Sequence, residues 1–383
     1  MNVLVNCLPL MSGGGVAYLR GLAPVLSGQF RDSSEGHCVK FVAYREQSPL
    51  LQAVPEAQIT WVRRSRLTGY RRILWERLNM ARIVDEEDTH VLFTPYQVGP
   101  PVRGPKHVLM IRNMEPFLCN GYAYSPNSWL RNQVLRWMSV RALRRADRVI
   151  AVSEFTRDYL AGVIGVGGHR IRTIYHGRQR CSAHNAEAAE DRGILKQLGV
   201  AGNYILTCGS LLPYRRHEDI IAAFEECFAV LAPGTLLVIA GSGTDRAYAK
   251  AIRQRIAASP HRDRIIAVGQ VPWDAMAALY RHCHFCIFAT EVEACPNIAI
   301  EAMATGCAIV SSDAPPLPEM FQGCSLQYRS RDIRHLALQM CRYAEDEGLR
   351  HEMKSLASKR GDTFSWETCA RETYSALVDW KSR

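Results

Sequence analysis

The sequence predicts two α/β domains, each a doubly wound, Rossmann-like parallel sheet. Short apolar segments alternate with amphipathic helical segments along nearly the whole chain, and the alternation starts again near residue 204. Such alternation is typical of parallel strands joined by helices that cover both faces of a sheet. The chain has 383 residues, which is ample for two domains of ordinary size.

Seven apolar segments are predicted as strands in the first half of the chain, and five in the second. They cover 3–8, 40–44, 59–62, 90–94, 107–112, 148–153 and 171–176, then 204–210, 236–243, 265–271, 285–290 and 307–312. Helices of the second half are expected to start near His217, Asp245, Trp273 and Asn297, and residues 364–380 form a last amphipathic pattern.

A polar, weakly periodic stretch between the two sets of strands predicts a linker at 181–195. The N-terminal domain then covers 1–180, the C-terminal domain 196–360, and a final helical segment 361–383. Two such domains in tandem are expected to face each other across a cleft. Ligands of doubly wound sheets bind at the carboxyl edges of the strands.

Composition favours a cytoplasmic globular protein. Hydrophobic residues make up 48% and charged residues 22%, and no run of about 18 apolar residues predicts a membrane-spanning helix. The N-terminal MNVLVNCLPLMSGGG lacks a basic leader and a cleavage site, so it is predicted as a first strand. The thirteen cysteines are scattered through predicted strands and helices, which favours reduced thiols.

The net charge of +10 favours a polyanionic partner, either nucleic acid, anionic lipid or a phosphorylated substrate. Cys283 and Cys286 have a CxxC spacing beside His282, but a zinc site needs further ligands, and a buried strand is the simpler interpretation. We therefore expect no metal and no cofactor. The sequence has no GxxxxGK[ST] motif, so P-loop nucleotide hydrolysis is not expected.

The segment EVEACPNIAIEAMATGCAIVSS, residues 291–312, carries the clearest chemical signal. It leaves a predicted strand, enters a helix near Asn297 and is predicted to stop at Gly306, which suits a left-handed helix end. The backbone amides of Asn297 and Ile298 at the helix start predict an anion site.

Glu293 lies just before this helix, and Glu301 lies about one turn inside it. Carboxylates on either side of a bound diphosphate can accept hydrogen bonds from the hydroxyls of the groups attached to it. A nucleotide sugar has such hydroxyls on both sides, on the sugar and on the ribose. The alternative is that both glutamates only interact with the helix dipole.

A second motif is CGSLLPYRRHEDIIAAFEE, residues 208–226, where a strand turns into a helix. Arg215 and Arg216 lie at the turn, and arginine can clamp a phosphate through two nitrogens. Two solvated surface arginines are the alternative.

A third motif is LMSGGGVAYLRGL, residues 10–22, which is predicted as strand, glycine turn and helix. Gly14 and Gly15 have no side chains, so a ligand can approach the backbone and the helix start. The spacing is not GxGxxG, and a tight turn without a ligand is the alternative.

Together these motifs resemble those of retaining glycosyltransferases of the GT-B fold, in glycosyltransferase family 4 (glycosyl transferases group 1). The resemblance covers nearly the whole chain. It is carried by the Glu293–Glu301 pair with seven residues between, by EAMATGCAIVSSD (301–313), GSLLPYRR (209–216), AVSEFTRDYL (151–160) and IYHG (174–177), and by FSW (364–366).

The resemblance implies that Glu293 contacts the hydroxyls of the donor sugar and that Glu301 holds the ribose. Arg215, where the family usually has lysine, would neutralise the departing diphosphate. Gly14 and Gly15 would approach donor phosphates and acceptor from an acceptor-side N-terminal domain, while the C-terminal domain binds the donor. The segment 361–383 would cross back to the N-terminal domain.

The sequence also departs from the family pattern. Arg112-Asn113 stands where the family often has His-Asp, so Arg112 and Asn113 are only candidates for substrate binding. Ser210 replaces a common arginine, so Arg216 is the candidate for the second positive charge. The loop after Glu293 is Ala-Cys-Pro rather than glycine-rich, which leaves fewer backbone donors for the sugar.

The implied reaction is transfer of a hexosyl group from a nucleoside-diphosphate sugar to a hydroxyl of a glycan or lipid-linked acceptor, with retention and without a metal. Cell-surface polysaccharide or lipopolysaccharide synthesis is the expected setting. Arginines and apolar residues mixed along 62–78 and 125–148 predict contact with an anionic membrane, at the inner face of the plasma membrane. Domain helices with a solvated basic face are the alternative.

Three other interpretations stay open at this point. A nucleotide-sugar epimerase of the same fold needs no acceptor, and a catalytically silent paralogue would bind the donor without transferring it. A nucleic-acid-binding protein is suggested by charge alone, and we expect no nucleic acid partner. The donor base, the sugar, the linkage and the oligomeric state are not readable from the sequence.

Overall fold

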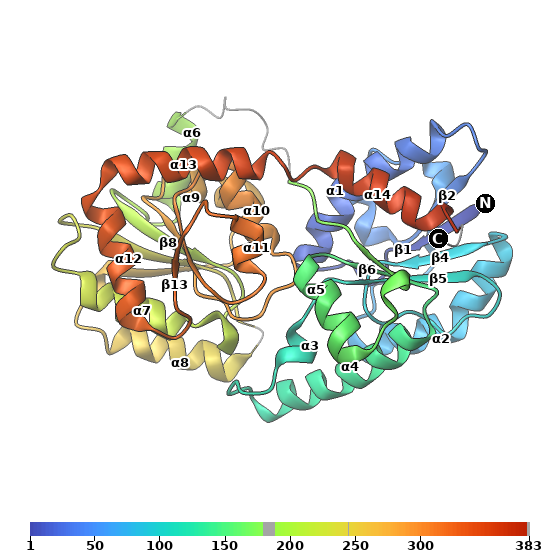
Figure 1. Cartoon of the computed structure of the whole chain (residues 1–383), viewed down its shortest axis with the longest axis horizontal. Helices are drawn as coiled ribbons and strands as arrows, with labels where there is room; N and C mark the ends of the chain where they lie inside the picture. Colours follow the sequence, from blue (N-terminus) through green and yellow to red (C-terminus); the bar gives the residue numbers. More distant parts are fainter. Residues whose placement is uncertain (179–187, 244, 381–383) are drawn as a thin grey trace. The chain divides into compact units, whose positions relative to one another are not determined.

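The computed structural model describes residues 1–178, 188–243 and 245–380. The chain divides into two compact units, coloured along the sequence in Figure 1. Unit 1 comprises Met1–Met114, Val134–Gln179 and Phe364–Arg383, and unit 2 comprises Glu115–Gln133 and Arg180–Thr363. The segment Glu115–Gln133 therefore groups with unit 2, although the sequence placed it inside the first domain.

Unit 1 is built on a seven-stranded sheet in the order β3-β2-β1-β4-β5-β6-β7, with every pair parallel. Its inner strands are buried at nearly every position, as expected for a sheet with helices on both faces. The strands are β1 (Asn2–Asn6), β2 (Cys38–Tyr44), β3 (Ile59–Val62), β4 (Val91–Thr94), β5 (Lys106–Ile111), β6 (Arg148–Ala151) and β7 (Ile171–Thr173). The helices are α1 (Gly14–Arg31), α2 (Gly69–Glu86), α5 (Glu154–Tyr159), α14 (Trp366–Val378) and most of α4 (Pro126–Arg145).

The last helix, α14, packs against α1 in unit 1. A Cβ atom at Gly21 of α1 would lie 2.0 Å from Cε2 of Trp366, so only glycine leaves room for this indole. The backbone at Gly177 is equally close, since a Cβ there would lie 2.2 Å from the Trp366 nitrogen. The C-terminal helix is thus an integral layer of unit 1.

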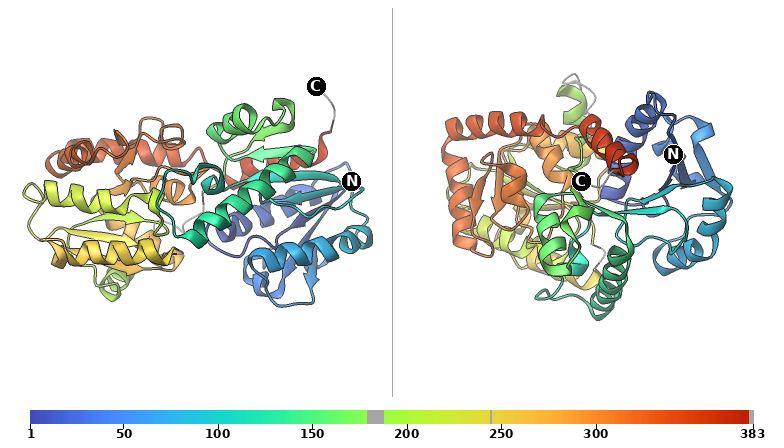
Figure 2. Two further views of the ribbon diagram at one scale, coloured as in Figure 1. Left: turned by 90° about the horizontal axis from the view of Figure 1, so that it is seen from below. Right: turned by 45° about the vertical axis from the view of Figure 1, so that its right-hand side comes forward.

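Unit 2 contains a six-stranded parallel sheet in the order β10-β9-β8-β11-β12-β13, and Figure 2 shows its helices from two further directions. The strands are β8 (Tyr204–Cys208), β9 (Leu236–Ala240), β10 (Ile265–Gly269), β11 (Cys286–Phe288), β12 (Ile309–Ser312) and β13 (Leu326–Tyr328). The helices are α3 (Glu115–Leu118), α6 (Ala188–Gln197), α7 (His217–Cys227), α8 (Arg246–Ala257), α9 (Trp273–His282), α10 (Asn297–Ala304), α11 (Leu317–Phe321), α12 (Ile333–Glu345) and α13 (Glu347–Gly361).

All twelve predicted strands are present, and β13 is an additional one. Of the predicted linker 181–195, residues 181–187 lie outside the described residues. Residues 188–195 are not a linker, because they form most of α6. Asp191 of this helix accepts a hydrogen bond of 2.8 Å from Nε of Arg281 in α9, which ties α6 to unit 2. Within the described ranges, no helix is long and apolar enough to cross a bilayer.

Candidate active site

The sheet of unit 2 reverses its strand order between β8 and β11. In a doubly wound sheet, the loops at the carboxyl ends of the two strands beside such a reversal diverge and leave room for a ligand. Here these loops are 209–216, after β8, and 289–296, after β11. They carry most of the predicted site residues of unit 2.

The two loops are joined by a buried ion pair. Nη2 of Arg215 lies 2.9 Å from Oε1 of Glu293, and the two side chains are only 14% and 11% exposed. The backbone holds the pair in register, because the amide of Glu291 donates a hydrogen bond of 2.9 Å to the carbonyl of Tyr214. A cation and a carboxylate that are 78 positions apart in sequence therefore form one ion pair where the strand order reverses.

Burial and mutual attraction act in opposite directions on this pair. Burial raises the pKa of Glu293, and Arg215 and Thr290 offset this only partly. For Arg215, burial acts to lower the pKa of the guanidinium, but Glu293 and Tyr214 outweigh burial and raise it. Arg215 therefore stays charged and can bind an anion. The neighbouring carboxyl of Glu293 is harder to ionise because it is shielded from water.

The position of Arg215 depends on a glycine below it. Gly209 follows β8 with φ of 120°, and a Cβ there would lie 2.7 Å from Nη1 of Arg215. Gly241, after β9, is packed just as closely, since a Cβ there would lie 1.8 Å from the carbonyl oxygen of Gly209. The two glycines let the loops after β8 and β9 meet and leave space for the guanidinium.

Helix α10 begins at Asn297, with Pro296 as its N-cap. The Pro296 carbonyl accepts hydrogen bonds from the amides of Ala299 and Ile300, and the first turn carries no acidic residue. Asn297 and Ile298, both half-buried, form this first turn. The positive end of the helix therefore follows directly on the loop that carries Glu293.

Glu301 lies one turn further along α10. Burial raises the pKa of its carboxyl to about 7. Its side chain makes no hydrogen bond with any of the residues that the structure describes. A buried carboxylate without donors is unfavourable, and hydroxyl donors from a ligand would stabilise its ionised form.

Arg216 does not join this cluster. Its backbone is left-handed, with φ of 52°. Its guanidinium lies on two carboxylates of α7, with Nη2 2.8 Å from Oδ1 of Asp219 and Nη1 2.9 Å from Oε1 of Glu218. Its charge is thus largely compensated, and the catalytic role predicted for it stays a prediction. Ser210 is exposed in the loop after β8.

Unit 1 carries the remaining predicted residues at the carboxyl edge of its own sheet. Gly14 and Gly15 open α1, behind an N-cap Gly13 with φ of 49°. Arg112, after β5, reaches this turn, because a Cβ at Gly15 would lie 3.2 Å from Nη2 of Arg112. Asn113 is the next residue along the chain and is half-buried.

Arg112 is held by neutral groups. Its Nε donates a hydrogen bond of 2.9 Å to the Pro95 carbonyl, and its guanidinium carbon lies 5.6 Å from the centre of the Tyr18 ring. Burial lowers the pKa of the guanidinium. No carboxylate of the described residues pairs with it. A cation beside a glycine turn and a helix start favours an anionic ligand.

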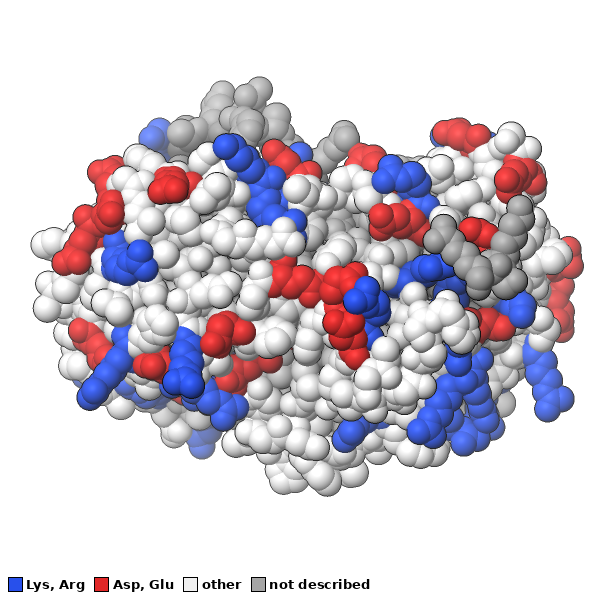
Figure 3. Space-filling view, in the orientation of Figure 1, with Lys and Arg blue, Asp and Glu red and all other residues white. Residues whose placement is uncertain are grey.

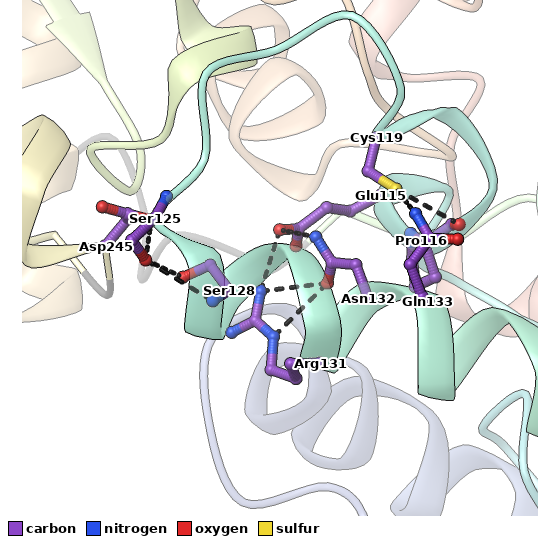
Figure 4. A network of polar contacts seen from close by, with 9 residues as sticks. All are labelled: Glu115, Pro116, Cys119, Ser125, Ser128, Arg131, Asn132, Gln133 and Asp245. Carbon is purple, nitrogen blue, oxygen red and sulfur yellow. Dashed lines mark hydrogen bonds and ion pairs between the residues drawn. The ribbon is translucent and has the colours of Figure 1, made fainter.

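The sequence analysis placed the segment Glu115–Gln133 in the first domain and assigned none of its residues to the site, and its polar contacts within unit 2 appear in Figure 4. Ser125 donates from its backbone and hydroxyl to Oδ2 of Asp245, at 3.1 and 2.8 Å, and the other oxygen of Asp245 caps α8. Asn132 and Arg131 donate to the buried Glu115. A helix over 125–148 was expected from the sequence, whereas the hydrogen bond from Ser125 to Asp245 leaves no local signal.

This segment reaches the Arg215 turn. The ring of Tyr122 meets that of Tyr214 edge-on, with centroids 6.2 Å apart. The guanidinium of Arg331 lies 5.6 Å from the centre of the Tyr122 ring and pairs with Glu291 at 2.7 Å. Glu291 lies in the same loop as Glu293, so this segment contacts both loops beside the strand reversal.

Two doubly wound parallel-sheet units in tandem are the architecture of GT-B glycosyltransferases. Residues 196–360 match the family Glycosyl transferases group 1, and residues 13–179 match Glycosyltransferase Family 4. The chain therefore belongs to this glycosyltransferase family, as its sequence motifs predicted.

Curated relatives are distant and include O-antigen enzymes. The serotype-specific mannosyltransferase WbdA of Escherichia coli is 22% identical over 59% of this chain and 28% of its own length. The O-antigen chain mannosyltransferase RfbU of Salmonella typhimurium is 21% identical over 58% of this chain. The match spans 57% of the length of RfbU.

Solved structures agree on the fold over nearly the full length. HepE of Anabaena in complex with UDP-glucose has a TM-score of 0.74 at 16% identity, covering 99% of this chain and 100% of HepE. Sucrose-phosphate synthase of Thermosynechococcus elongatus has a TM-score of 0.74 at 16% identity, covering 98% of each chain. At these identities the likeness establishes the GT-B fold.

Proposed function

We propose that this protein transfers a hexosyl group from a nucleoside-diphosphate sugar to a hydroxyl of a glycan or lipid-linked acceptor, with retention of configuration. The observation that carries the proposal is the buried Arg215–Glu293 pair next to the start of α10. The relatives named above include O-antigen mannosyltransferases and a protein crystallised with UDP-glucose, which supports this substrate class.

The chemistry required of the site is stabilisation of a leaving group. When the bond between the anomeric carbon and the phosphate oxygen breaks, negative charge develops on the diphosphate. Arg215 is charged and already fixed by Glu293, and the amides at Asn297 and Ile298 add the positive end of a helix. Donors fixed before the reaction lower the barrier because they need no reorganisation.

The two glutamates would bind the two groups attached to the diphosphate. Glu293 would accept hydrogen bonds from the donor sugar, and Glu301 would accept them from the ribose. The raised pKa of Glu301 fits this role, because hydroxyl donors from the ligand would supply partners that its carboxylate lacks among the described residues. To retain the configuration, the acceptor hydroxyl would attack the anomeric carbon on the same face of the sugar from which the diphosphate departs.

The acceptor belongs to the same proposal. We infer a surface glycan built on a lipid carrier, because WbdA and RfbU are named as O-antigen or serotype-specific enzymes. Such an acceptor would place the enzyme at the inner face of the plasma membrane. No metal is part of the proposed chemistry.

Calorimetric titration with nucleoside diphosphates and their sugars, followed by product analysis with a lipid-linked oligosaccharide, tests the proposal. We expect one nucleotide to bind, the Glu301→Ala variant to bind it more weakly, and a glycosylated lipid to form. An isomerised free sugar without any acceptor would identify an epimerase. Donor binding without transfer or hydrolysis would identify a silent paralogue.

A further inference from the structure

Unit 1 carries a groove of about 590 Å³ that none of the predicted site residues line. It exists because the connection from β4 to β5, residues 95–105, contains no helix, whereas α2 and α4 cover the sheet on either side of it. Both helices lie on the same face of the sheet. The connections from β3 to β4 and from β5 to β6 run in the same direction across the sheet, and right-handed crossovers in one direction place their helices on one face. The floor includes His107 and Leu109 of β5.

Four arginines line the groove, namely Arg77, Arg103, Arg141 and Arg145. None of them forms an ion pair with a carboxylate of the described residues. The one acidic residue of the lining, Glu76, is buried and already neutralised, with Oε1 2.8 Å from Arg72 and 3.2 Å from Asn6. In Figure 3, lysine and arginine side chains gather at the lower right of this face, near the part of unit 1 where Figure 1 labels α2.

Helices α2 and α4, which flank the groove, also expose large apolar side chains, most of them outside its lining. Tyr70, Leu74 and Leu78, spaced by four residues along α2, are 75%, 56% and 72% exposed. On α4, Val134 and Trp137 are 50% and 65% exposed, and Trp137 itself lines the groove. Burying these side chains requires an apolar environment that water and soluble anions do not provide.

We propose that this groove binds the phosphate headgroup of an anionic phospholipid and so docks unit 1 on an anionic membrane. Guanidinium groups bind phosphate through paired hydrogen bonds, and tryptophan and tyrosine favour the boundary between headgroups and acyl chains. The arginines would therefore contact the phosphate headgroup, and the exposed apolar side chains of α2 and α4 would contact the acyl chains of the same phospholipid. The inference deepens the proposed function, because it supplies a surface by which the enzyme reaches a lipid-linked acceptor.

Co-sedimentation of the full chain with vesicles tests this inference without any nucleotide. We expect binding to phosphatidylcholine vesicles that contain phosphatidylglycerol, and binding at least about tenfold weaker to phosphatidylcholine alone, since each arginine at an anionic surface strengthens binding about fivefold. Glycerol phosphate in solution should compete only weakly, because it lacks the acyl chains that the exposed apolar side chains would contact. Equal binding to both vesicles, or no binding to either, would overturn the proposal.

Charge-reversal variants distinguish membrane binding by the groove from binding caused by the net charge of the chain. Arg103→Glu with Arg141→Glu should weaken vesicle binding at least about tenfold. Arg253→Glu with Arg334→Glu makes the same change of charge at two exposed arginines of unit 2 and should have a much smaller effect. Equal losses in the two double variants would show that the total charge of the protein, and not the groove, causes binding.

Fluorescence quenching gives a readout that does not need charge reversal. Brominated phospholipid should quench the wild-type protein, and Trp137→Phe should reduce the quenched fraction. Unchanged quenching would contradict insertion of this helix face.

Because nucleotide binding is measured without vesicles, failure of the groove proposal and failure of the proposed function are distinguishable. Tighter binding to a single-stranded oligonucleotide than to vesicles would identify a nucleic-acid surface instead.

Discussion

The carboxyl edges of the two sheets use the same parts in different ways. Each has a strand, a glycine turn, a helix start and a half-buried or buried arginine. In unit 2, Arg215 is fixed by the carboxylate of Glu293 at 2.9 Å. In unit 1, Arg112 rests on the Pro95 carbonyl and the Tyr18 ring, which are both neutral.

This difference has a physical consequence. A paired cation keeps its position and charge before the ligand arrives, as stabilisation of a leaving group requires. A cation among neutral groups gains most from a ligand that brings its own negative charge. We therefore expect unit 2 to be preorganised for reaction and Arg112 of unit 1 to contribute mainly to binding.

The largest expected effect concerns stability. Glu293→Gln leaves the Arg215 charge buried without its partner, so the free energy of unfolding should fall by about 3 kcal/mol. Arg112→Gln removes a cation that has no acidic partner among the described residues, so the loss should stay at about 1 kcal/mol. Denaturant unfolding of both variants measures the difference. Equal losses would mean that the Arg215–Glu293 pair is not a stabilising unit.

The next effect concerns turnover. Arg215→Ala removes the fixed cation, so kcat should fall about a hundredfold, as for loss of one donor from an oxyanion site. Arg216→Ala is the matched control, because the charge of Arg216 is compensated by Asp219 and Glu218. Steady-state kinetics with donor and acceptor measure both. A comparable loss in Arg216→Ala would support the catalytic role predicted for Arg216.

Donor affinity should depend on pH through Glu301. The ribose hydroxyls require the ionised carboxylate, and a pKa of about 7 leaves roughly a tenth of it ionised one pH unit below. Affinity for the nucleotide sugar should therefore rise about tenfold from pH 6 to pH 8. In Glu301→Gln the profile should be flat. Titration calorimetry measures the affinity, and a wild-type profile that is also flat would remove Glu301 from the ribose site.

The smallest effect concerns the stability of the ligand-free protein. The pKa of Glu301 is raised from 4.5 to about 7 in the fold, so the folded state binds this proton more tightly than the unfolded state. Its contribution to stability is full below pH 4.5 and is lost as the pH rises through 7. Glu301→Gln should raise the melting temperature by a few degrees at pH 8 and by less at pH 5.5. A variant that melts lower at pH 8 would contradict this.

Much of the fold was predictable from local signals. The twelve predicted strands are apolar runs with turn residues at their ends, and the starts of α7, α9 and α10 fall on the predicted residues. Strand β13, at Leu326–Tyr328, was not predicted, although β7 and β11 are equally short. Helix α6 was missed because its polar composition hid an amphipathic helix that packs on α9.

The candidate site was predictable in its parts and not in its pairing. Helix starts and glycine turns leave local marks, so Asn297, Gly14 and Gly15 could be placed from sequence. Nothing in the sequence indicates that Glu293 forms an ion pair with Arg215, that Arg216 turns toward Asp219, or that Ser125 reaches Asp245. These contacts join residues whose side-chain directions depend on left-handed backbone and loop packing.

The sequence by itself determined the two parallel-sheet units, the strand-turn-helix motifs and the family, because periodicity, glycine placement and spacing act within a few residues. Only the tertiary structure decided which charges are paired, which carboxyl is buried enough for a pKa of about 7, and where a missing helix leaves a groove lined by arginines. Burial and charge pairing depend on distances in space between segments that are remote in sequence, and those distances exist only once the chain is folded.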